Sequence, residues 1–420
     1  MSLAETMMRR VVEPSVVRFY QWRGDPVARW MHPKGKADPY ALYEEIRPRG
    51  FVRSRLGVCA TVSHATAERI LRDRRFSSSP AHARGYRPPP YPEGDPRAEL
   101  PESLLFLDPP DHTRLRRLVS SAFTPRAIAD LEPPIRDITG RLLDSAGDKA
   151  GFDLIEVLAF PLPIAVICRL LGIPAEDQAR FRVWGHHLAT TLEPQTRRAA
   201  ESDSRSAELA LTAYLQDLVE KRRADPDDSL LSALIAAEEE GDRLTSAELV
   251  STALLLLVAG FETTVNLIGN GTVALLGERE QWQRLCEEPG LIPGAVEELL
   301  RYDSPVQMTS RIATGDLDVD GVPVRKGTPV IVAIGGANRD PEVFDQPGRL
   351  MIERQNASAH LSFSLGIHHC LGAALARLEG RVALEELTRR YPGLEMAGTP
   401  VRRPLLVLRG FEHVPVRAGS

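Results

Sequence analysis

The sequence predicts a mainly α-helical protein with a small β region, and three features of the chain support this prediction. From Leu249 to Gly277 the only charged residue is Glu262, which indicates one long helix buried in the core. A second apolar run with helical character extends from Leu371 to Leu387. Short stretches in which apolar residues alternate account for the β region. With 420 residues, 43% of them hydrophobic, the chain has ample material for a large core.

Four short segments are expected to form strands of a small sheet at one side of the molecule. Apolar residues recur in them with the period of two that is typical of half-buried strands. In chain order the segments are 51–55, 58–62, 322–324 and 330–332. We expect most of the remaining chain to be helical.

The long uncharged run is also, by its length, a formal candidate for a membrane span. However, Asn266, Asn270, four threonines and four glycines dilute its apolar character. Thr245 and Glu248 form a capping box, which is the usual start of a helix in water. We therefore expect a core helix and no membrane insertion.

Composition and charge argue against a nucleic-acid-binding, exported or disulfide-rich protein. The net charge of -5 comes from scattered residues, so we expect no nucleic-acid partner. No apolar region follows Arg9 and Arg10, so these residues do not indicate an export signal, and we expect a cytoplasmic protein. Cys59, Cys168 and Cys286 have no close spacing, which favours buried thiols over a zinc site or a disulfide framework.

The stretch from Phe363 to Gly372 reads Phe-Ser-Leu-Gly-Ile-His-His-Cys-Leu-Gly. Its cysteine, Cys370, stands directly before the second apolar run, where free backbone N–H groups and the positive end of the helix dipole favour a thiolate. A lone cysteine is more often a small buried hydrophobic residue. Written as Phe-x-x-Gly-x-His-x-Cys-x-Gly, however, the stretch resembles the haem-binding loop of the cytochrome P450 family, whose iron is bound by a cysteine thiolate.

This resemblance extends from about Asp38 to near the C-terminus. It implies a single cytochrome P450 catalytic domain over 38–420, preceded by an irregular extension over 1–37. A haem b would be buried between the oxygen-binding helix and the helix that follows the cysteine. In this reading Cys370 is the metal ligand. The other residues of the loop expected to contact the cofactor are Phe363, Gly366, His368 and Gly372.

The segment Ala259 to Thr264 combines two features that are unfavourable in a buried helix. Gly260 costs about 1 kcal/mol relative to alanine, and a buried carboxylate such as Glu262 costs several more unless it is partnered. Taken alone, the segment could be a helix with a tolerated glycine and a satisfied polar pair. It resembles the family's oxygen-binding helix, Ala-Gly-x-Asp/Glu-Thr-Thr. By that resemblance Thr263 hydrogen-bonds the bound dioxygen and Glu262 relays protons to it.

Glu298 and Arg301 are spaced i, i+3 in the helical segment 294–302, so they share one helix face. An exposed pair of this kind contributes only about 0 to 1 kcal/mol. The pair resembles the family's Glu-x-x-Arg, whose buried ion pair is joined by a third arginine. Arg349 is the matching residue, although Leu350 and Met351 stand where many relatives have Phe-Asp. These residues are assigned to folding and haem retention.

The two propionates of a buried haem need cationic or hydrogen-bonding partners. Each of the matching residues could also be an ordinary surface residue. By the resemblance, the expected donors are His112, Arg116, Arg311 and His360, with His368 as a fifth.

The resemblance implies a soluble, bacterial-type monooxygenase that inserts one oxygen atom from O2 into an apolar small molecule, by hydroxylation or epoxidation. Electrons would come from a separate ferredoxin or flavodoxin with its reductase. A haem-thiolate sensor or carrier would not need the Glu262–Thr263 pair, and a peroxygenase would lack it. The residues expected to face the substrate are Leu256, Ala259, Val306, Met308 and Phe411.

Two surface regions complete the expectations. The stretch from Ser77 to Pro101 is rich in Pro, Gly and Ser and is expected to be a loop, with Tyr86 and Tyr91 as its bulky residues. By the resemblance, this loop would close over the substrate side of the haem. By the same resemblance, three arginines lie near the cysteine side of the haem, where they would attract an acidic redox partner or remain merely solvated. They are Arg114, Arg117 and Arg377.

Overall fold

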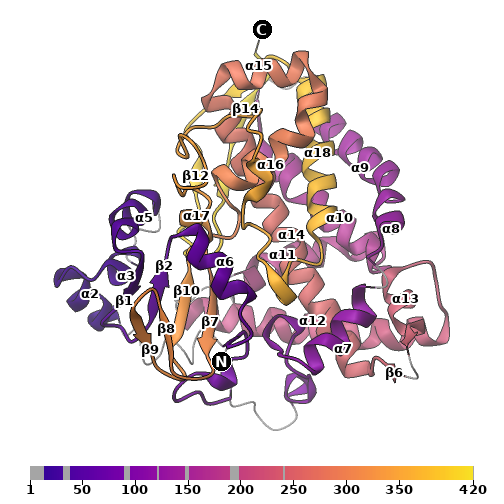
Figure 1. Ribbon diagram of the computed structural model, residues 1–420. Helices are drawn as coiled ribbons and strands as arrows, with labels where there is room; N and C mark the ends of the chain where they lie inside the picture. Colours follow the sequence, from indigo (N-terminus) through magenta and orange to yellow (C-terminus); the bar gives the residue numbers. More distant parts are fainter. Residues whose placement is uncertain are drawn as a thin grey trace.

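The computed structural model describes residues 14–31, 38–88, 95–120, 123–146, 151–189, 198–239 and 242–419. Helices form most of the molecule, and the strands of the main sheet gather at one side together with the N-terminal helices (Figure 1). The predicted fold class, mainly α with a small β region, is therefore confirmed. The helices are α2 (Pro14–Trp22), α3 (Pro26–Trp30), α5 (Tyr40–Ile46), α6 (His64–Arg72), α7 (Asp111–Ser120), α8 (Pro125–Ala129), α9 (Glu132–Ala146), α10 (Pro161–Leu170), α11 (Gln178–Ala189), α12 (Arg198–Ala224), α13 (Leu230–Ala236), α14 (Ser246–Gly277), α15 (Arg279–Glu287), α16 (Ile292–Tyr302), α17 (Ile334–Ala337) and α18 (Ala373–Arg390).

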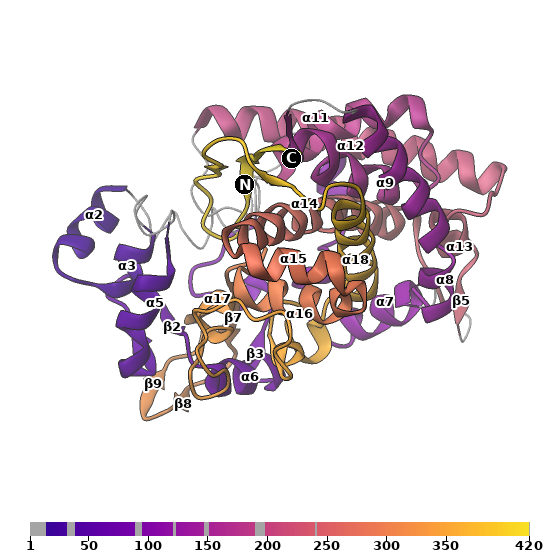
Figure 2. The ribbon, with the colours of Figure 1, turned by 90° about the horizontal axis from the view of Figure 1, so that it is seen from above.

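Helix α14 is the long helix that the sequence predicts. The capping box of Thr245 and Glu248 is present at its start, and α14 packs against α10, α12, α16 and α18. Figure 2 shows α15, α16 and α18 alongside it. The helix is long and apolar enough for a membrane span, but 61% of its most apolar window is buried inside the protein. Gly271 allows the close approach of α16, because a Cβ there would lie 2.9 Å from Leu299.

The main sheet has five strands in the order β1-β2-β10-β7-β3. Strand β10 runs parallel to β2 and antiparallel to β7, with Val330 opposite both Cys59 and Arg311. Three of the four predicted strand segments lie in this sheet. The fourth, 322–324, pairs instead with 317–319 in a separate hairpin. The strands are β1 (Phe51–Arg53), β2 (Cys59–Thr61), β3 (Phe76–Ser77), β4 (Phe152–Asp153), β5 (Glu238–Glu239), β6 (Asp242–Arg243), β7 (Thr309–Ala313), β8 (Leu317–Val319), β9 (Val322–Val324), β10 (Pro329–Val332), β11 (Glu395–Met396), β12 (Val401–Arg402), β13 (Phe411–His413) and β14 (Pro415–Arg417).

The N-terminal region differs from the expectation of an irregular extension over 1–37. Its described residues, 14–31, form helices α2 and α3. The Asp25 carboxylate caps α3 by accepting from the N–H groups of Val27 and Ala28, at 3.1 and 3.0 Å. Trp30 is buried in a second core cluster, with its ring 5.2 Å from that of Tyr43. An aspartate followed by proline is a recognised helix start, so the sequence contained this signal. The domain boundary at residue 38 stays a prediction.

The segment between Ser77 and Pro101 contains short turns of 3-10 helix, at Pro80–His82 and Pro96–Glu99. Its start is fixed by Asp108, whose carboxylate accepts hydrogen bonds from the Ser77 hydroxyl and from the Ser78 N–H. Tyr86 interacts with Glu102, and this interaction together with burial raises the pKa of Tyr86. Tyr91 lies outside the described residues.

Candidate functional site

Cys370 lies just before α18, and Gly372 is the N-cap residue of that helix. The loop is held closed by the N–H of Cys370, which donates to the carbonyl of Phe363 at 2.8 Å. Gly366 has a φ of +69°, and a Cβ there would lie 2.6 Å from the carbonyl oxygen of Leu71. The glycine in the predicted motif is therefore required by both its conformation and its close contact with α6.

The Cys370 side chain is accessible, yet the protein that surrounds it raises the pKa of the thiol. The Gly372 N–H and the guanidinium groups of Arg116 and Arg377 oppose this effect and pull the pKa down. The sulfur therefore faces groups that favour an anion, although they do not by themselves overcome desolvation. A bound metal cation would supply the additional stabilisation that a thiolate needs.

Four cationic or imidazole side chains come together beside this loop, and we call them the cation group. His112 and Arg116 come from α7, Arg311 comes from β7, and His368 comes from the cysteine loop. The rings of His112 and His368 lie 4.3 Å apart. Both ring nitrogens of His112, and Nε2 of His368, are buried without a hydrogen-bond partner. Within the described ranges, no carboxylate forms an ion pair with Arg116 or Arg311.

Burial and mutual repulsion make this group electrostatically unfavourable. Burial lowers the pKa of Arg311 to about 10. Burial, followed by the charges of Arg311, His112 and Arg116, lowers the pKa of His368 to about 3. Among the described residues, Arg311 donates only to the uncharged Thr309 hydroxyl and Ser310 carbonyl. The orphaned ring nitrogens of His112 and His368 are costly when buried. This arrangement fits an anionic ligand. The two propionates of a haem supply such anions, and the Cys370 thiol supplies the axial ligand. The residues present therefore fit the haem that the sequence predicts.

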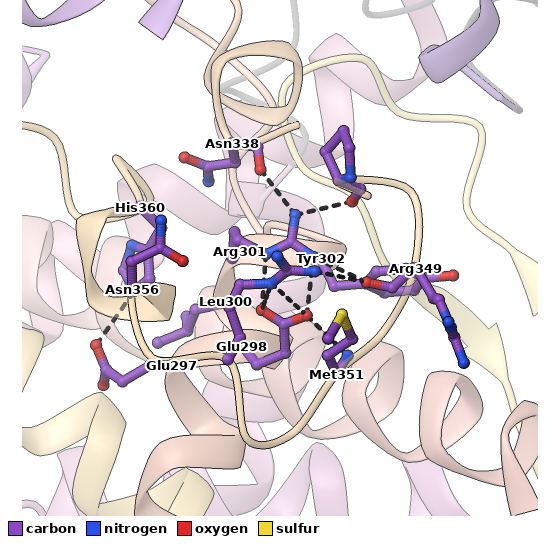
Figure 3. A network of polar contacts seen from close by, with 12 residues as sticks. Glu297, Glu298, Leu300, Arg301, Tyr302, Asn338, Arg349, Met351, Asn356 and His360 are labelled. Carbon is purple, nitrogen blue, oxygen red and sulfur yellow. Dashed lines mark hydrogen bonds and ion pairs between the residues drawn. The ribbon is translucent and has the colours of Figure 1, made fainter. Parts of the chain in front are cut away.

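His360 was expected among the propionate donors, but the structure gives it a different partner. Its Nε2 lies 3.3 Å from the carboxylate of Glu297, a residue that the sequence analysis did not identify (Figure 3). The same carboxylate accepts hydrogen bonds from Arg377 at 2.6 and 3.0 Å. The guanidinium carbon of Arg377 lies 4.4 Å from the ring centroid of Phe363. His360 and Arg377 thus belong to a second group, which contains its own acid.

The predicted Glu298–Arg301 pair is present and fully buried, with Arg301 Nε 2.7 Å from the Glu298 carboxylate (Figure 3). The third arginine is Arg354, whose Nε lies 3.1 Å from the same carboxylate. The assignment of Arg349 is therefore corrected. The Arg349 side chain is exposed and bonds to Gln346 at 3.3 Å, while its carbonyl oxygen accepts from Arg301 at 3.2 Å.

The predicted catalytic pair lies in the middle of α14, and its two members have different surroundings. The hydroxyl of Thr263 is partly exposed and donates to the carbonyl of Ala259 at 3.0 Å. Thr264 forms the same kind of bond to Gly260, at 3.3 Å. Such bonds to the preceding turn tend to bend a helix. The Glu262 carboxylate, in contrast, is fully buried and contacts the guanidinium group of Arg403.

The five residues expected to face the substrate do not share one environment. Leu256 is half-buried and Ala259 is exposed, although both belong to the central helix. Val306 is half-buried and pairs with Leu408 in an isolated β-bridge. Met308 is only 8% exposed and packs in the second core cluster.

Phe411 corrects the prediction, because it is a core residue. It is 2% exposed, and the guanidinium carbon of Arg402 lies 4.0 Å from its ring centroid. An apolar C-terminal residue can face a ligand or the core, and its sequence does not distinguish the two.

The predicted redox-partner arginines are engaged within the protein to different extents. Arg114 contacts the carboxylate of Glu248 and lies 3.4 Å from that of Asp242. Arg377 is bound by Glu297, whereas the side chain of Arg117 is exposed. At least two of the three positive charges are therefore partly neutralised before any partner arrives.

Two of the remaining cysteines behave as predicted. Cys59 and Cys168 are buried, and burial raises the pKa of their thiols to about 11 and about 12, respectively. Cys286 is half-buried, with its sulfur 4.0 Å from the carbonyl oxygen of Pro392. These thiols are poor nucleophiles at neutral pH, which leaves Cys370 as the cysteine with a distinct environment.

Comparison with known proteins agrees with this geometry. Residues 87–405 match the family Cytochrome P450. The chain is 45% identical over 326 residues to cytochrome P450 107B1 of Saccharopolyspora erythraea, with 77% of this chain and 78% of that protein covered. It is 41% identical over 416 residues to a putative cytochrome P450 140 of Mycobacterium tuberculosis, with 94% and 93% covered.

Solved structures give the same result. The cytochrome P450 PksS of Bacillus subtilis superimposes with a TM-score of 0.85 at 36% identity, over 93% of this chain and 100% of that one. The ligand-free CYP164A2 of Mycobacterium smegmatis superimposes with a TM-score of 0.84 at 39% identity, over 93% of this chain and 99% of that one. The family match over residues 87–405 includes the helix of Glu262 and Thr263 as well as the cysteine loop. The chain belongs to the cytochrome P450 family and is a monooxygenase that uses haem iron.

Proposed function

We propose that this protein is a haem b monooxygenase that uses Cys370 as its axial ligand and oxidises an apolar small molecule with one atom of O2. The observation that supports this proposal most directly is the cation group. Its members are buried or half-buried, its arginines form no ion pair with a carboxylate among the described residues, and it lies beside an accessible cysteine. Electrons would arrive one at a time from a separate ferredoxin or flavodoxin with its reductase. We further propose a cytoplasmic location.

The protein's own contribution begins with holding the cofactor. Cys370 provides the sulfur ligand at the N-terminal end of α18, where backbone N–H groups stabilise its negative charge. Arg116, Arg311 and the two histidines of the cation group would bind the propionates by charge-assisted hydrogen bonds. When bound, the haem supplies oxygen activation, and the thiolate donates electron density that favours O–O cleavage.

Proton delivery is the second contribution, because cleavage of the O–O bond consumes two protons. The Thr263 hydroxyl lies on the partly exposed face of α14 and can exchange its bond to Ala259 for one to the oxygen substrate. Glu262 holds a carboxylate one residue away, but this group is buried against Arg403. In this proposal, protons reach Glu262 along the side of Arg403 and are passed towards Thr263 by water.

An apolar substrate is supported by the surroundings of the pair and by the names of relatives. Leu256, Ala259 and Val306 present hydrocarbon surface that is not fully buried. One relative, 45% identical, is a vitamin D(3) 25-hydroxylase of Pseudonocardia autotrophica, and another, 43% identical, is a 6-deoxyerythronolide B hydroxylase. Both names describe hydroxylation of large molecules rich in C–H bonds. We propose that this protein likewise hydroxylates an unactivated C–H bond of its substrate.

Spectroscopy of the purified holoprotein tests the ligand. The reduced protein with carbon monoxide is expected to show the strongly red-shifted absorption band of thiolate ligation, and Cys370→His is expected to abolish it. A wild-type spectrum like that of a histidine-ligated globin would refute the proposal. Addition of a library of apolar compounds to the ferric protein, with the spin state monitored by absorption, then identifies the substrate class.

Substitution of Thr263 separates binding from chemistry. Thr263→Ala is expected to keep the haem content and the substrate affinity, because the hydroxyl acts only after oxygen has bound. Product formed per electron pair should fall, with a matching release of hydrogen peroxide, while Glu262→Gln should slow the whole cycle. Unchanged product yield per electron pair in Thr263→Ala would show that this residue only packs the helix.

A further inference from the structure

Two consecutive glutamates of α16 have different partners. Glu298 points to Arg301 and Arg354, in the buried cluster described above. Glu297 lies on the side of His360, with its carboxylate 3.3 Å from Nε2 of that residue (Figure 3). The same carboxylate accepts two hydrogen bonds from Arg377 of α18. Burial alone would raise the pKa of Glu297, but His360 and Arg377 overcome this effect and lower it to about 2. Glu297 is therefore negatively charged throughout the physiological pH range.

A short chain of contacts links this carboxylate to the proposed ligand. Arg377 lies over the ring of Phe363, at 4.4 Å from its centroid, and the ring of His360 lies 5.7 Å from the same ring. The carbonyl of Phe363 accepts the hydrogen bond from the N–H of Cys370. Arg377 therefore packs on the residue whose carbonyl holds the backbone of Cys370. Through Phe363, the position of the Arg377 charge is coupled to the loop that carries the sulfur.

We propose that Glu297 is a positioning residue that sets the reduction potential of the haem, by holding Arg377 over Phe363 and offsetting its positive charge. The inference rests on the proposed ligation by Cys370. One-electron reduction adds a negative charge to the iron centre, so a nearby positive charge favours the reduced form and a nearby carboxylate opposes it. Groups beyond the first ligand commonly tune metal centres in this way.

A purely structural ion pair is the alternative explanation. The Arg377 side chain is 37% exposed, and pairs as accessible as this contribute about 0 to 1 kcal/mol to stability. Such a pair would change the unfolding free energy slightly and leave the haem potential where it was. The potential is therefore the measurement that separates the two explanations.

The test is a spectroelectrochemical titration of the ferric and ferrous holoprotein, restricted to preparations with an intact thiolate carbon monoxide band. Glu297→Gln keeps the size of the side chain and removes its charge. It is expected to raise the equilibrium constant for reduction about threefold to tenfold, which is roughly 30 to 60 mV upward for one electron. Arg377→Gln removes the positive charge, leaves Glu297 uncompensated, and is expected to shift the potential downward.

Helix α18 also offers a matched control. One turn beyond Arg377, Arg381 binds the carboxylate of Glu132 at 2.6 Å, and Glu132 also binds Arg136 at 2.7 Å. Glu132→Gln therefore removes one negative charge from beside an arginine of α18, as Glu297→Gln does. Its arginine, Arg381, lies farther along the helix from the cysteine loop. The reduction potential of Glu132→Gln is expected to match that of the wild type. The potential of Glu297→Asp should also match it, because this variant keeps the charge.

Several outcomes would overturn the inference. One is an unchanged potential in Glu297→Gln, and another is an equal shift in Glu132→Gln. A Glu297→Gln shift that persists undiminished in the Arg377→Gln background would show that Arg377 is not the intermediary. If Glu297→Gln fails to retain haem, the sign of the Arg377→Gln shift decides, because an upward or absent shift contradicts the proposal. Absence of the thiolate band from the wild type would instead refute the proposed ligation.

Discussion

The buried charges around Glu298 and the cation group beside Cys370 are balanced in different ways. The Glu298 carboxylate is fully buried, but Arg301 and Arg354 lie within 3.1 Å of it, and the N–H of Met351 donates to it at 2.9 Å. The cation group has no such acid: within the described part of the chain, neither Arg116 nor Arg311 forms an ion pair with a carboxylate. The first cluster is buried, and the cation group is buried at His112 and Arg311, yet only the first is complete without a ligand.

This difference shows how a buried charge can indicate either a fold or a site. A cluster that compensates its own charges stabilises the fold, because removal of one partner leaves the other buried charges unpaired. A cluster of one sign costs free energy in the protein alone, and this cost is recovered when an anion binds. The cation group therefore indicates a ligand site independently of the cysteine motif. Glu297, next to Glu298 in the chain, belongs to neither cluster and binds His360 and Arg377 instead.

The largest effect is expected where the compensated cluster is broken. Glu298→Gln leaves two buried guanidinium groups without their acid and is expected to lower the free energy of unfolding by about 3 to 5 kcal/mol. Arg354→Gln removes one charge-assisted bond and should cost about 1.5 to 3 kcal/mol. Arg349→Gln, on the exposed side of the same loop, should change stability by about 0.5 kcal/mol or less. Urea unfolding followed by circular dichroism measures all three.

The comparison of Arg349 with Arg354 also shows what the sequence could predict and what it could not. The Glu298–Arg301 pair was predictable, since an i, i+3 spacing fixes the two side chains on one helix face. The third arginine lies in an irregular loop, where Gln346 has a φ of +44° and the direction of each side chain depends on that turn. If Arg349→Gln were as destabilising as Arg354→Gln, the placement of this loop would be wrong.

The same distinction holds for the other predicted residues. The capping box of α14 was predictable because its two residues are three positions apart. Gly366 also meets the carbonyl of Leu71 in α6, which the sequence does not show, and the role of Cys370 stays a prediction. His360 and Phe411 were assigned by position alone. The surroundings of His360 are set by Glu297, which is distant in the sequence, and those of Phe411 include Arg402 on the paired strand β12. Glu297 was missed because an acid next to Glu298 reads as an ordinary helix residue. Its role depends on the packing of α16 against α18.

Glu379 is a buried carboxyl group, and its burial makes the free energy of unfolding depend on pH. Oε2 of Glu379, on α18, has no hydrogen-bond partner, and burial raises the pKa of this carboxyl to about 8. Because the folded pKa lies above the unfolded value of 4.5, the stabilisation is fully present below pH 4.5. It is lost as the pH rises towards 8, since the unfolded chain releases a proton that the folded protein retains.

The free energy of unfolding of the wild type should therefore contain a component that falls by up to about 1.4 kcal/mol per pH unit between these limits. Glu379→Gln removes the titrating group and should give a correspondingly flatter profile over the same range. Urea unfolding at several pH values between 5 and 8 makes the comparison. Parallel profiles for the two proteins would mean that Glu379 finds a partner in solution.

The last prediction concerns the cation group itself. Arg311→Gln removes a buried charge that forms no ion pair with a carboxylate among the described residues, so its main consequence should appear in haem retention. Loss of one charge-assisted hydrogen bond, about 1.5 to 3 kcal/mol, corresponds to roughly tenfold to hundredfold faster transfer of haem to an excess of an apoglobin acceptor. Arg381→Gln, which breaks the paired arginine of α18 near Glu132, should release haem at the wild-type rate.

His360→Gln provides the discriminating comparison for this last prediction. His360 has Glu297 as a partner, so its replacement should accelerate haem transfer less than Arg311→Gln does. This order of haem-transfer rates follows from charge balance, because a side chain that already pairs with a carboxylate of the protein interacts less strongly with a propionate. Equal acceleration by the two variants would place His360 among the propionate donors after all. A wild-type rate in Arg311→Gln would show that the uncompensated charges of the cation group serve some other anion.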